Sequence, residues 1–303
     1  MDRRLWRPAA VLLVLVIGVT GVYFYRHHRG AKVLARSAVL RLARRIPRAA
    51  SQPTAGSPLY DELQPIRLSN CELERFGEPN DGGYLVCGNL LGAVEGAYSY
   101  GISGYDQWGC DISSRLHVTT HEYDCFDTHA PTCPSGALTF HGECVGGSSV
   151  EVDGRRFDTV ERQIGKNGDG GKRLVVKMDV EGAEWESLRQ TSDAVLDRID
   201  QLIVEFHHPD DSRAIELTKK LTRLFYVAHL HFNNYSCGDD TRWRSFPAWA
   251  YGVLVTNRHP FPAWAYEVLL VNKRVGVPAP GAPVVRPDPK DAPNNPGAAD
   301  CQY

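Results

Sequence analysis

The sequence lacks three patterns that would point directly to common functions. None of its eight cysteines lies in a Cys-x-x-Cys pair, so the usual spacing of a zinc site is missing. It has no complete Gly-x-Gly-x-x-Gly, which disfavours a dinucleotide such as NAD. Eleven Lys and Arg residues lie in residues 1–50, which leaves a net charge of about −12 for the rest of the chain. We do not expect a folded domain with that charge to bind nucleic acid.

What the sequence does have is the composition of a globular protein, with 43% hydrophobic and 23% charged residues. The distribution of apolar, basic and proline residues along the chain divides it into four segments. Residues 1–30 are predicted to be a membrane anchor, 31–58 a basic stalk and linker, and 59–277 one folded domain. The stalk either lies on a membrane surface as a helix or is a solvated basic segment. Residues 278–303 include seven prolines and little apolar content, so we predict a disordered tail.

The predicted anchor is an uncharged run of 17 residues, Ala9 to Tyr25. Three aromatic residues end the run, as at a membrane interface, and favour a spanning helix over the alternative, a cleaved signal peptide. More basic residues follow the run than precede it, which favours a cytosolic domain. The even number of cysteines and the sequon at Asn234 favour an oxidising compartment instead. We therefore expect a single-pass protein of the Golgi or ER with a lumenal domain.

Apolar runs alternate with helical or turn-rich segments in the folded domain, which predicts a parallel sheet with crossover helices. Seven strands are predicted, at residues 96–102, 117–126, 137–145, 173–180, 201–207, 225–232 and 266–273. The predicted fold class is thus a doubly wound, Rossmann-like α/β sheet. The segment "FPAWAYGVLVTN" from Phe246 recurs as "FPAWAYEVLLVN" from Phe261, and we assign the last strand to the second copy.

Ligands of such a sheet bind beyond the carboxyl ends of its strands, so the residues that follow each strand are the candidates. The first strand leads into a glycine turn that either approaches a ligand or is an ordinary turn. An acid after the second strand either holds a ribose diol or caps a turn. The candidates for cofactor binding are Gly101, Ser103, Gly104, Asp106, Asp127 and Glu143, the last as a partner of an adenine amino group.

The fourth strand ends in "MDVEGAEWESL", in which Asp179 is predicted to cap the next helix and Glu181 to lie beside the pocket. Glu184 and Glu186 are predicted to face solvent. The fifth strand ends in "EFHH", where His207 is the candidate general base, because imidazole titrates near neutrality. The candidate catalytic residues are Asp179, Glu181, Glu205 and His207.

Five segments together resemble the FkbM-type and methyltransferase-like group of S-adenosylmethionine-dependent methyltransferases. They are "ELERFGEPNDGGYLVC", "SYGISGYDQWGCDISSR", "DCFD", "VVKMDVEGAEWESL" and "LIVEFHH". The resemblance implies a seven-stranded class I methyltransferase fold with S-adenosyl-L-methionine as methyl donor. By position, Gly101, Ser103 and Gly104 would pass beneath the cofactor, and Asp127 would hold its ribose. Asp179 and Glu181 would line the reaction site.

The expected reaction is O-methylation of a small-molecule or glycan-like acceptor, with His207 or Asp179 taking the proton. Two alternatives remain open. Asp179-Val180-Glu181 imitates the Asp-x-Asp of metal-dependent glycosyltransferases, and the fold could also serve as an inactive binding module. We predict no metal site, although Asp179, Glu205 and His207 are of ligand types that could form one.

Overall fold

The computed structural model describes residues 58–208, 211–236 and 264–301. The predicted anchor, most of the stalk and the first copy of the repeat lie outside these residues. No helix of the described ranges combines the length and the apolar character that crossing a bilayer requires.

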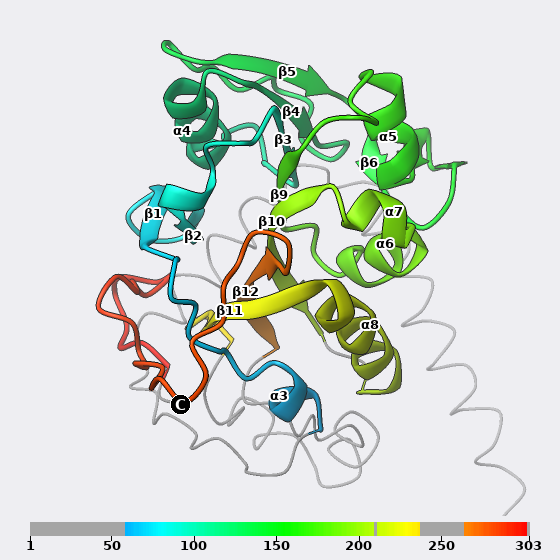
Figure 1. The fold of residues 1–303 in the computed structure, drawn as a ribbon. Coiled ribbons are helices and arrows are strands. Elements are labelled where there is room, and N and C mark those ends of the chain that lie inside the picture. Colours follow the sequence, from blue (N-terminus) through cyan, green and yellow to red (C-terminus); the bar gives the residue numbers. More distant parts are fainter. Residues whose placement is uncertain (1–57, 209–210, 237–263, 302–303) are drawn as a thin grey trace, which may run out of the picture. The chain divides into compact units, whose positions relative to one another are not determined.

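A seven-stranded sheet forms the centre of the fold, in the order β11-β12-β10-β9-β3-β4-β5 (Figure 1). Its strands are β3 (Gly96–Tyr100), β4 (Thr119–Tyr123), β5 (Ala137–His141), β9 (Leu174–Met178), β10 (Ile199–His207), β11 (Phe225–Phe232) and β12 (Ala265–Asn272). β12 runs antiparallel to both of its neighbours, and the other pairs are parallel. The seven predicted strands are confirmed, and β12 belongs to the second copy of the repeat.

The chain reverses its direction of travel across the sheet between β3 and β9. It runs outward from β3 to β4 and β5, and then returns to β9 and β10 on the other side of β3. Such a switch point opens a crevice at the carboxyl ends of the two strands. The residues that follow β3 and β9 therefore lie at the place where a ligand can enter.

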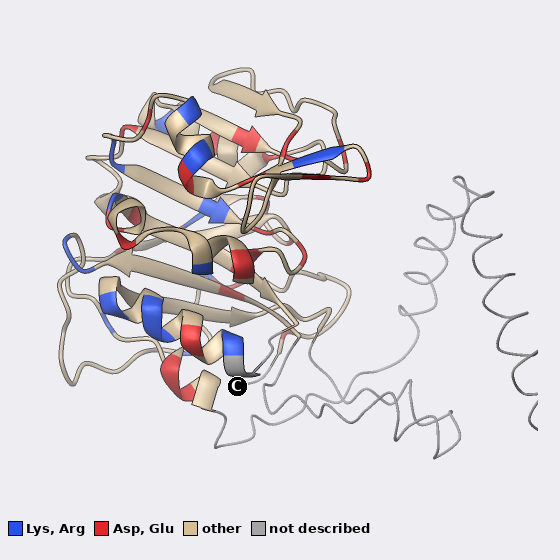
Figure 2. Ribbon diagram, turned by 90° about the vertical axis from the view of Figure 1, so that its right-hand side faces the viewer, with Lys and Arg blue, Asp and Glu red and all other residues tan. Residues whose placement is uncertain are grey.

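Helices cover the sheet on both faces (Figure 1). They are α3 (Pro58–Glu62), α4 (Gln107–Leu116), α5 (Val160–Lys166), α6 (Glu184–Gln190), α7 (Asp193–Leu196) and α8 (Asp211–Leu224). Side chains alternate between the faces, so that Tyr98, Val176 and Leu202 join the core beneath α5, α6 and α8. Acidic and basic residues follow one another along α8 in Figure 2, as expected of a helix with one face in water.

The opposite face carries α4 and a β-hairpin of β1 (Leu73–Gly77) and β2 (Gly83–Cys87). Phe76, Tyr84 and Trp108 are fully buried there against Val175 and Ile203 of the sheet. A short 3-10 helix, η1 (Gly88–Leu90), follows β2. The strand prediction did not include this hairpin, which provides one wall of the site.

The residues that connect β5 to α5 in the sequence form a smaller, three-stranded sheet with the strand order β6-β8-β7. Its strands are β6 (Cys144–Val145), β7 (Val150–Val152) and β8 (Arg155–Asp158). The predicted third strand, 137–145, is thus divided between two sheets.

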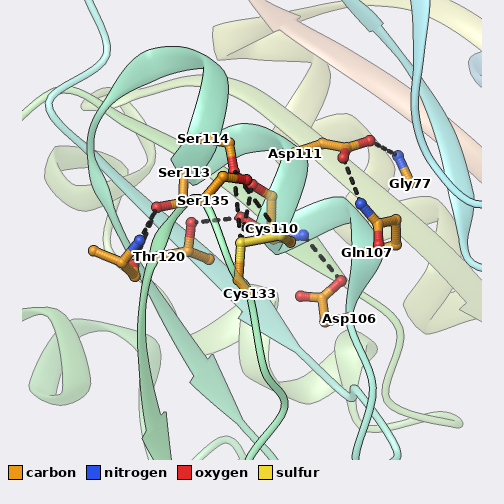
Figure 3. The surroundings of a disulfide bond; sticks show 12 residues. Gly77, Asp106, Gln107, Cys110, Asp111, Ser113, Ser114, Thr120, Cys133 and Ser135 are labelled. Carbon is orange, nitrogen blue, oxygen red and sulfur yellow. Dashed lines mark hydrogen bonds between the residues drawn. A yellow bond between two sulfur atoms is a disulfide. The ribbon is translucent and has the colours of Figure 1, made fainter.

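Three disulfides lie in the described part of the chain: Cys71–Cys87, Cys110–Cys133 and Cys125–Cys144. Figure 3 shows the one that ties α4 to the loop between β4 and β5. On the same helix, Asp111 accepts a hydrogen bond from the backbone amide of Gly77 in the hairpin, at 2.8 Å. Both connections fix α4, and with it the turn that precedes the helix.

The prediction that the Pro-rich tail is disordered is wrong. Residues 278–301 are described in the structure and contact the domain. Asp291 and Asp300 pair with His229 and His231 of the edge strand β11, at 2.8 and 3.0 Å. Cys301 is disulfide-bonded as well. Composition excludes a core built by the tail alone, but it does not exclude docking on polar side chains of a finished sheet.

Asn234 of the predicted sequon is fully buried by this tail. Its side-chain nitrogen donates to the carbonyl oxygens of Asn295, Ala298 and Ala299, at 3.0 to 3.3 Å. The folded domain therefore offers no accessible acceptor for a glycan at this position.

Candidate functional site

The turn that follows β3 has a backbone that side chains rarely allow. Gly101, Ser103 and Gly104 all have positive φ, at 76°, 50° and 78°. A Cβ atom on Gly101 would lie 1.7 Å from the carbonyl oxygen of Asp179, so only glycine fits there. The turn consequently passes directly against the residue that follows β9.

Asp124 holds this turn in place from the end of β4. Its Oδ2 accepts the backbone amides of Ile102 and Ser103, at 3.1 and 2.8 Å. Its Oδ1 accepts those of Phe126 and Asp127, at 2.8 and 3.0 Å. Because both oxygens are taken by amides, Asp124 is a structural residue that joins the two loops.

Asp106 caps α4, with its Oδ1 accepting the backbone amide of Gly109 at 3.0 Å. Its Oδ2 is buried and has no hydrogen-bond partner among the described residues. The carboxylate of Glu122 lies beside it and is fully buried. Burial, together with the charge of Asp106, raises the pKa of Glu122 to about 8.

A cavity of about 260 Å³, here named the turn cavity, opens between this turn and the hairpin. Four acids line it against the single cation Lys177, whose Nζ donates to the carbonyl of Gly101 at 2.7 Å. The acids are Glu78, Asp81, Asp106 and Asp179. Its lining is therefore suited to a ligand with positive charge.

Asp179, Glu205 and His207 converge at the ends of β9 and β10 and are here named the edge cluster. His207 Nε2 lies 3.8 Å from Asp179 Oδ1 and 3.7 Å from Glu205 Oε1. Glu181 Oε2 lies 3.9 Å from the same nitrogen, on a side chain that is 75% exposed. The structure thus brings together all four predicted catalytic residues.

Neutral hydrogen-bond donors hold two carboxylates of the edge cluster, the buried Glu205 and the partly exposed Asp179. The Tyr84 hydroxyl donates to Asp179 Oδ2 at 2.9 Å and lies 3.4 Å from Glu205 Oε2. Asn233 Nδ2 donates to Glu205 Oε1 at 2.7 Å. Asp179 Oδ1 remains directed at His207.

Negative charge accumulates at the edge cluster. Burial raises the pKa of Glu205 well above its ordinary value, and the nearby carboxylates of Asp179 and Glu267 raise it further. Burial alone would lower the pKa of His207, but Glu184, Asp179 and Glu181 outweigh that effect and raise it. The cluster therefore favours a bound cation or proton.

A second cavity of about 200 Å³, here named the α6 cavity, lies on the other side of His207. Its lining includes Trp185, Arg189, His208 and Arg213. Trp185 stacks on Phe206, and its Nε1 donates to the carbonyl of His207 at 2.6 Å. Since Asp179 lines the turn cavity and His207 lines the α6 cavity, the edge cluster stands between the two.

The predicted cofactor residues divide into two groups. Asp127 lies against the turn, because a Cβ atom on Gly104 would come 3.0 Å from its carboxylate. Glu143 lies elsewhere, paired with Arg156 and Lys166, each at 3.2 Å. Neither Glu143 nor Asp127 lines the turn cavity, and Asp127 Oδ1 accepts the backbone amide of His129 at 3.0 Å.

Two predictions about the α6 segment are wrong. Glu184 is fully buried rather than solvent-facing, and its Oε1 accepts the backbone amide of His207 at 2.6 Å. Asp179 does not cap α6, whose N-cap is Ala183. Glu181 and Gly182, at φ of 57° and 109°, separate the strand from the helix and displace the cap by four residues. Glu186 does face solvent and pairs with Arg189.

Sequence reasoning also missed three supporting residues, which are Tyr84, Asn233 and Glu184. Tyr84 and Asn233 come from the hairpin and from the end of β11, and nothing in their local pattern indicates a position beside β9. For Glu184, its place five residues after Asp179 in the predicted pocket segment was the available signal.

Comparison with protein families agrees with this geometry. Residues 97–237 match the model of the methyltransferase FkbM domain. Over these residues the chain is similar to an FkbM methyltransferase domain. No curated protein and no solved structure matches the chain. The FkbM domain includes the turn and the edge cluster, whereas Tyr84, β12 and the tail lie outside the matched residues.

Proposed function

We propose that the protein transfers a methyl group from S-adenosyl-L-methionine to a hydroxyl of a small-molecule or glycan-like acceptor, at the carboxyl edge of the sheet. One observation carries the proposal. The glycine turn and the edge cluster are in direct backbone contact, since a Cβ atom on Gly101 would lie 1.7 Å from the carbonyl oxygen of Asp179. A donor bound at the turn would lie beside the acids that can receive the acceptor's proton.

The glycine turn and the acidic lining of the turn cavity support this cofactor. Gly101 lets the turn pass directly against Asp179, and the acids of the cavity would complement the sulfonium and ammonium charges. Asp127, beside Gly104, would accept hydrogen bonds from the ribose hydroxyls. Bound there, the cofactor supplies a methyl group on a sulfonium centre that is open to in-line displacement. The paired carboxylate of Glu143 does not support the expected contact with adenine.

The chain's own residues hold the acceptor and receive its proton. Tyr84 and Asn233 fix the carboxylates of Asp179 and Glu205 by hydrogen bonds. Burial of Glu205 and His207 keeps water away from the reacting oxygen. The acceptor would enter through the α6 cavity, where Trp185 offers an aromatic wall.

We further propose that the domain works in an oxidising compartment, on the membrane-anchored chain that residues 9–25 predict. Three disulfides in a domain of this size support an oxidising environment. Protease protection of the domain in sealed microsomes would test the orientation: a protected domain supports a lumenal site, and a digested one refutes it.

Titration calorimetry with the full chain tests the function. S-adenosyl-L-methionine should give saturable heat at one site per chain, and labelled methyl groups should pass to alcohols or glycans in an acceptor panel. Heat only from a nucleotide sugar with Mn²⁺ would identify a glycosyltransferase. No heat from either ligand would identify an inactive module.

A further inference from the structure

The edge cluster has the spacing of a metal site. One ligand atom from each of Asp179, Glu205 and His207 lies within 4.8 Å of the other two. The distances from His207 Nε2 to the two carboxylates, 3.8 and 3.7 Å, are too long for hydrogen bonds. Two ligands of one ion, each about 2.1 Å from it, lie roughly 3 to 4 Å apart. Small side-chain movements would therefore bring all three atoms onto a common ion.

His207 provides a second, independent observation. Its side chain is only 4% exposed, and neither ring nitrogen makes a hydrogen bond among the described residues, while Nε2 is directed at the carboxylates. Nδ1 lies 3.5 Å from Oε1 of the buried Glu184. Histidines that bind metals commonly present their other nitrogen to a carboxylate, which fixes the ring. Glu184 occupies that position, and it also fixes the backbone amide of His207.

The local charge also lacks compensation. Within the described part of the chain, no Lys or Arg lies within 4.0 Å of the carboxylates of Asp179 or Glu205. Glu267 and Asp81 add negative charge close by, and Asn294 of the tail bridges these two by donating at 2.8 and 3.1 Å. A neutral amide leaves the charge in place, and a divalent cation would balance it.

We propose that Asp179, Glu205 and His207 bind one divalent transition-metal ion, with Glu184 positioning His207. This inference rests on the proposed function and deepens it, because the ion would stand between the two cavities and hold the acceptor oxygen. Two carboxylates and one imidazole suit Mn²⁺, Fe²⁺ or Zn²⁺ better than Ca²⁺, which prefers oxygen ligands alone. With His207 and Asp179 as ligands, Glu181 is the carboxylate of the site that stays free to take the acceptor's proton.

The test is calorimetric and paramagnetic-resonance titration of the full chain with Mn²⁺, after treatment with a chelator. One Mn²⁺ should bind per chain, and Ca²⁺ should not displace it. His207→Gln and Asp179→Asn should weaken binding by at least 100-fold. Glu184→Gln should weaken it by about 10- to 100-fold, as expected for an outer partner. The exposed Glu151→Gln is the matched control and should bind like the wild type.

Circular dichroism would establish that each variant is folded, and Glu205→Gln provides a third ligand variant should one fail to fold. Absence of Mn²⁺ binding by the wild type, or binding unchanged in folded ligand variants, would overturn the inference. Calorimetry with S-adenosyl-L-methionine in the chelating buffer separates the two proposals. Cofactor heat without any Mn²⁺ site leaves the methyltransferase standing and removes only the ion.

Discussion

Carboxylates at the two ends of the central strands have different surroundings. At the amino end, Asp200 is fully buried and pairs with Arg173 at 2.7 Å and with Arg274 at 3.4 Å. At the carboxyl end, Asp179 and Glu205 have a tyrosine, an amide and a histidine as neighbours. Within the described residues, the same sheet thus pairs the buried Asp200 with arginines at one end and leaves the buried Glu205 and the partly exposed Asp179 without a Lys or Arg within 4.0 Å at the other.

The difference distinguishes a structural acid from a functional one. A buried charge without a partner costs stability, and substitution by a neutral residue of similar shape would relieve that cost. Sites that bind ligands often keep such unfavourable groups, because the ligand compensates them. On this reasoning the arginines balance the charge of Asp200 at the amino end, as the proposed ligand would balance that of Asp179 and Glu205 at the carboxyl end.

The largest expected effect is on catalysis. His207→Ala and Asp179→Ala should each lower methyl transfer by at least about 100-fold, since proton transfer and positioning both depend on the edge cluster. The labelled-methyl assay measures this loss, and calorimetry with the cofactor shows whether the turn cavity is intact. If both variants bound cofactor and turned over normally, the cluster would have no catalytic role.

A stability effect of about 2 kcal/mol is expected at the opposite end of the strands. Arg173→Met leaves Asp200 with Arg274 alone and makes the amino end resemble the carboxyl end. The estimate is below that for a fully buried pair because Arg173 is 39% exposed. Urea unfolding measures the loss, and methyl transfer per folded molecule should be unchanged. A large loss of transfer would contradict the structural role of this end.

An effect of pH on the free energy of unfolding is expected for Glu122, which is fully buried beside Asp106 and within the field of Lys177. Burial raises its pKa from 4.5 to about 8, so the folded state binds a proton that the unfolded state has released. Its contribution to stability should therefore fall as the pH rises from 4.5 to 8. Urea unfolding across this range should show a slope that Glu122→Gln removes. An identical slope in both proteins would exclude Glu122 as its source.

The strands and the turn could be predicted because their signals are local. Apolar runs between helical or turn-rich segments predicted all seven strands, and Gly101 and Gly104 marked the turn. Asp179, Glu205 and His207 were predicted together because parallel strands deliver their carboxyl ends to one edge. These are properties of neighbouring residues in the chain.

The supporting residues could not be predicted, because they depend on contacts between distant segments. Tyr84 reaches Asp179 across 95 positions, and Asn294 reaches Asp81 across 213. Glu184 is buried because it accepts the backbone amide of His207 in β10. The local sequence of α6 gives no sign of this contact. The tail was misjudged for the same reason, since its partners belong to β11 and β12.

The most direct test compares Asp179→Asn with Asp200→Asn by urea unfolding, in one chelating buffer at neutral pH. Asp200→Asn should lose about 2 kcal/mol in the free energy of unfolding, because it removes the buried carboxylate that pairs with Arg173 and Arg274. Asp179→Asn should be at least as stable as the wild type, because it removes one of several crowded negative charges. A loss for Asp179→Asn as large as that for Asp200→Asn would show that the carboxyl-end acids are structural, and would contradict the distinction between the two ends.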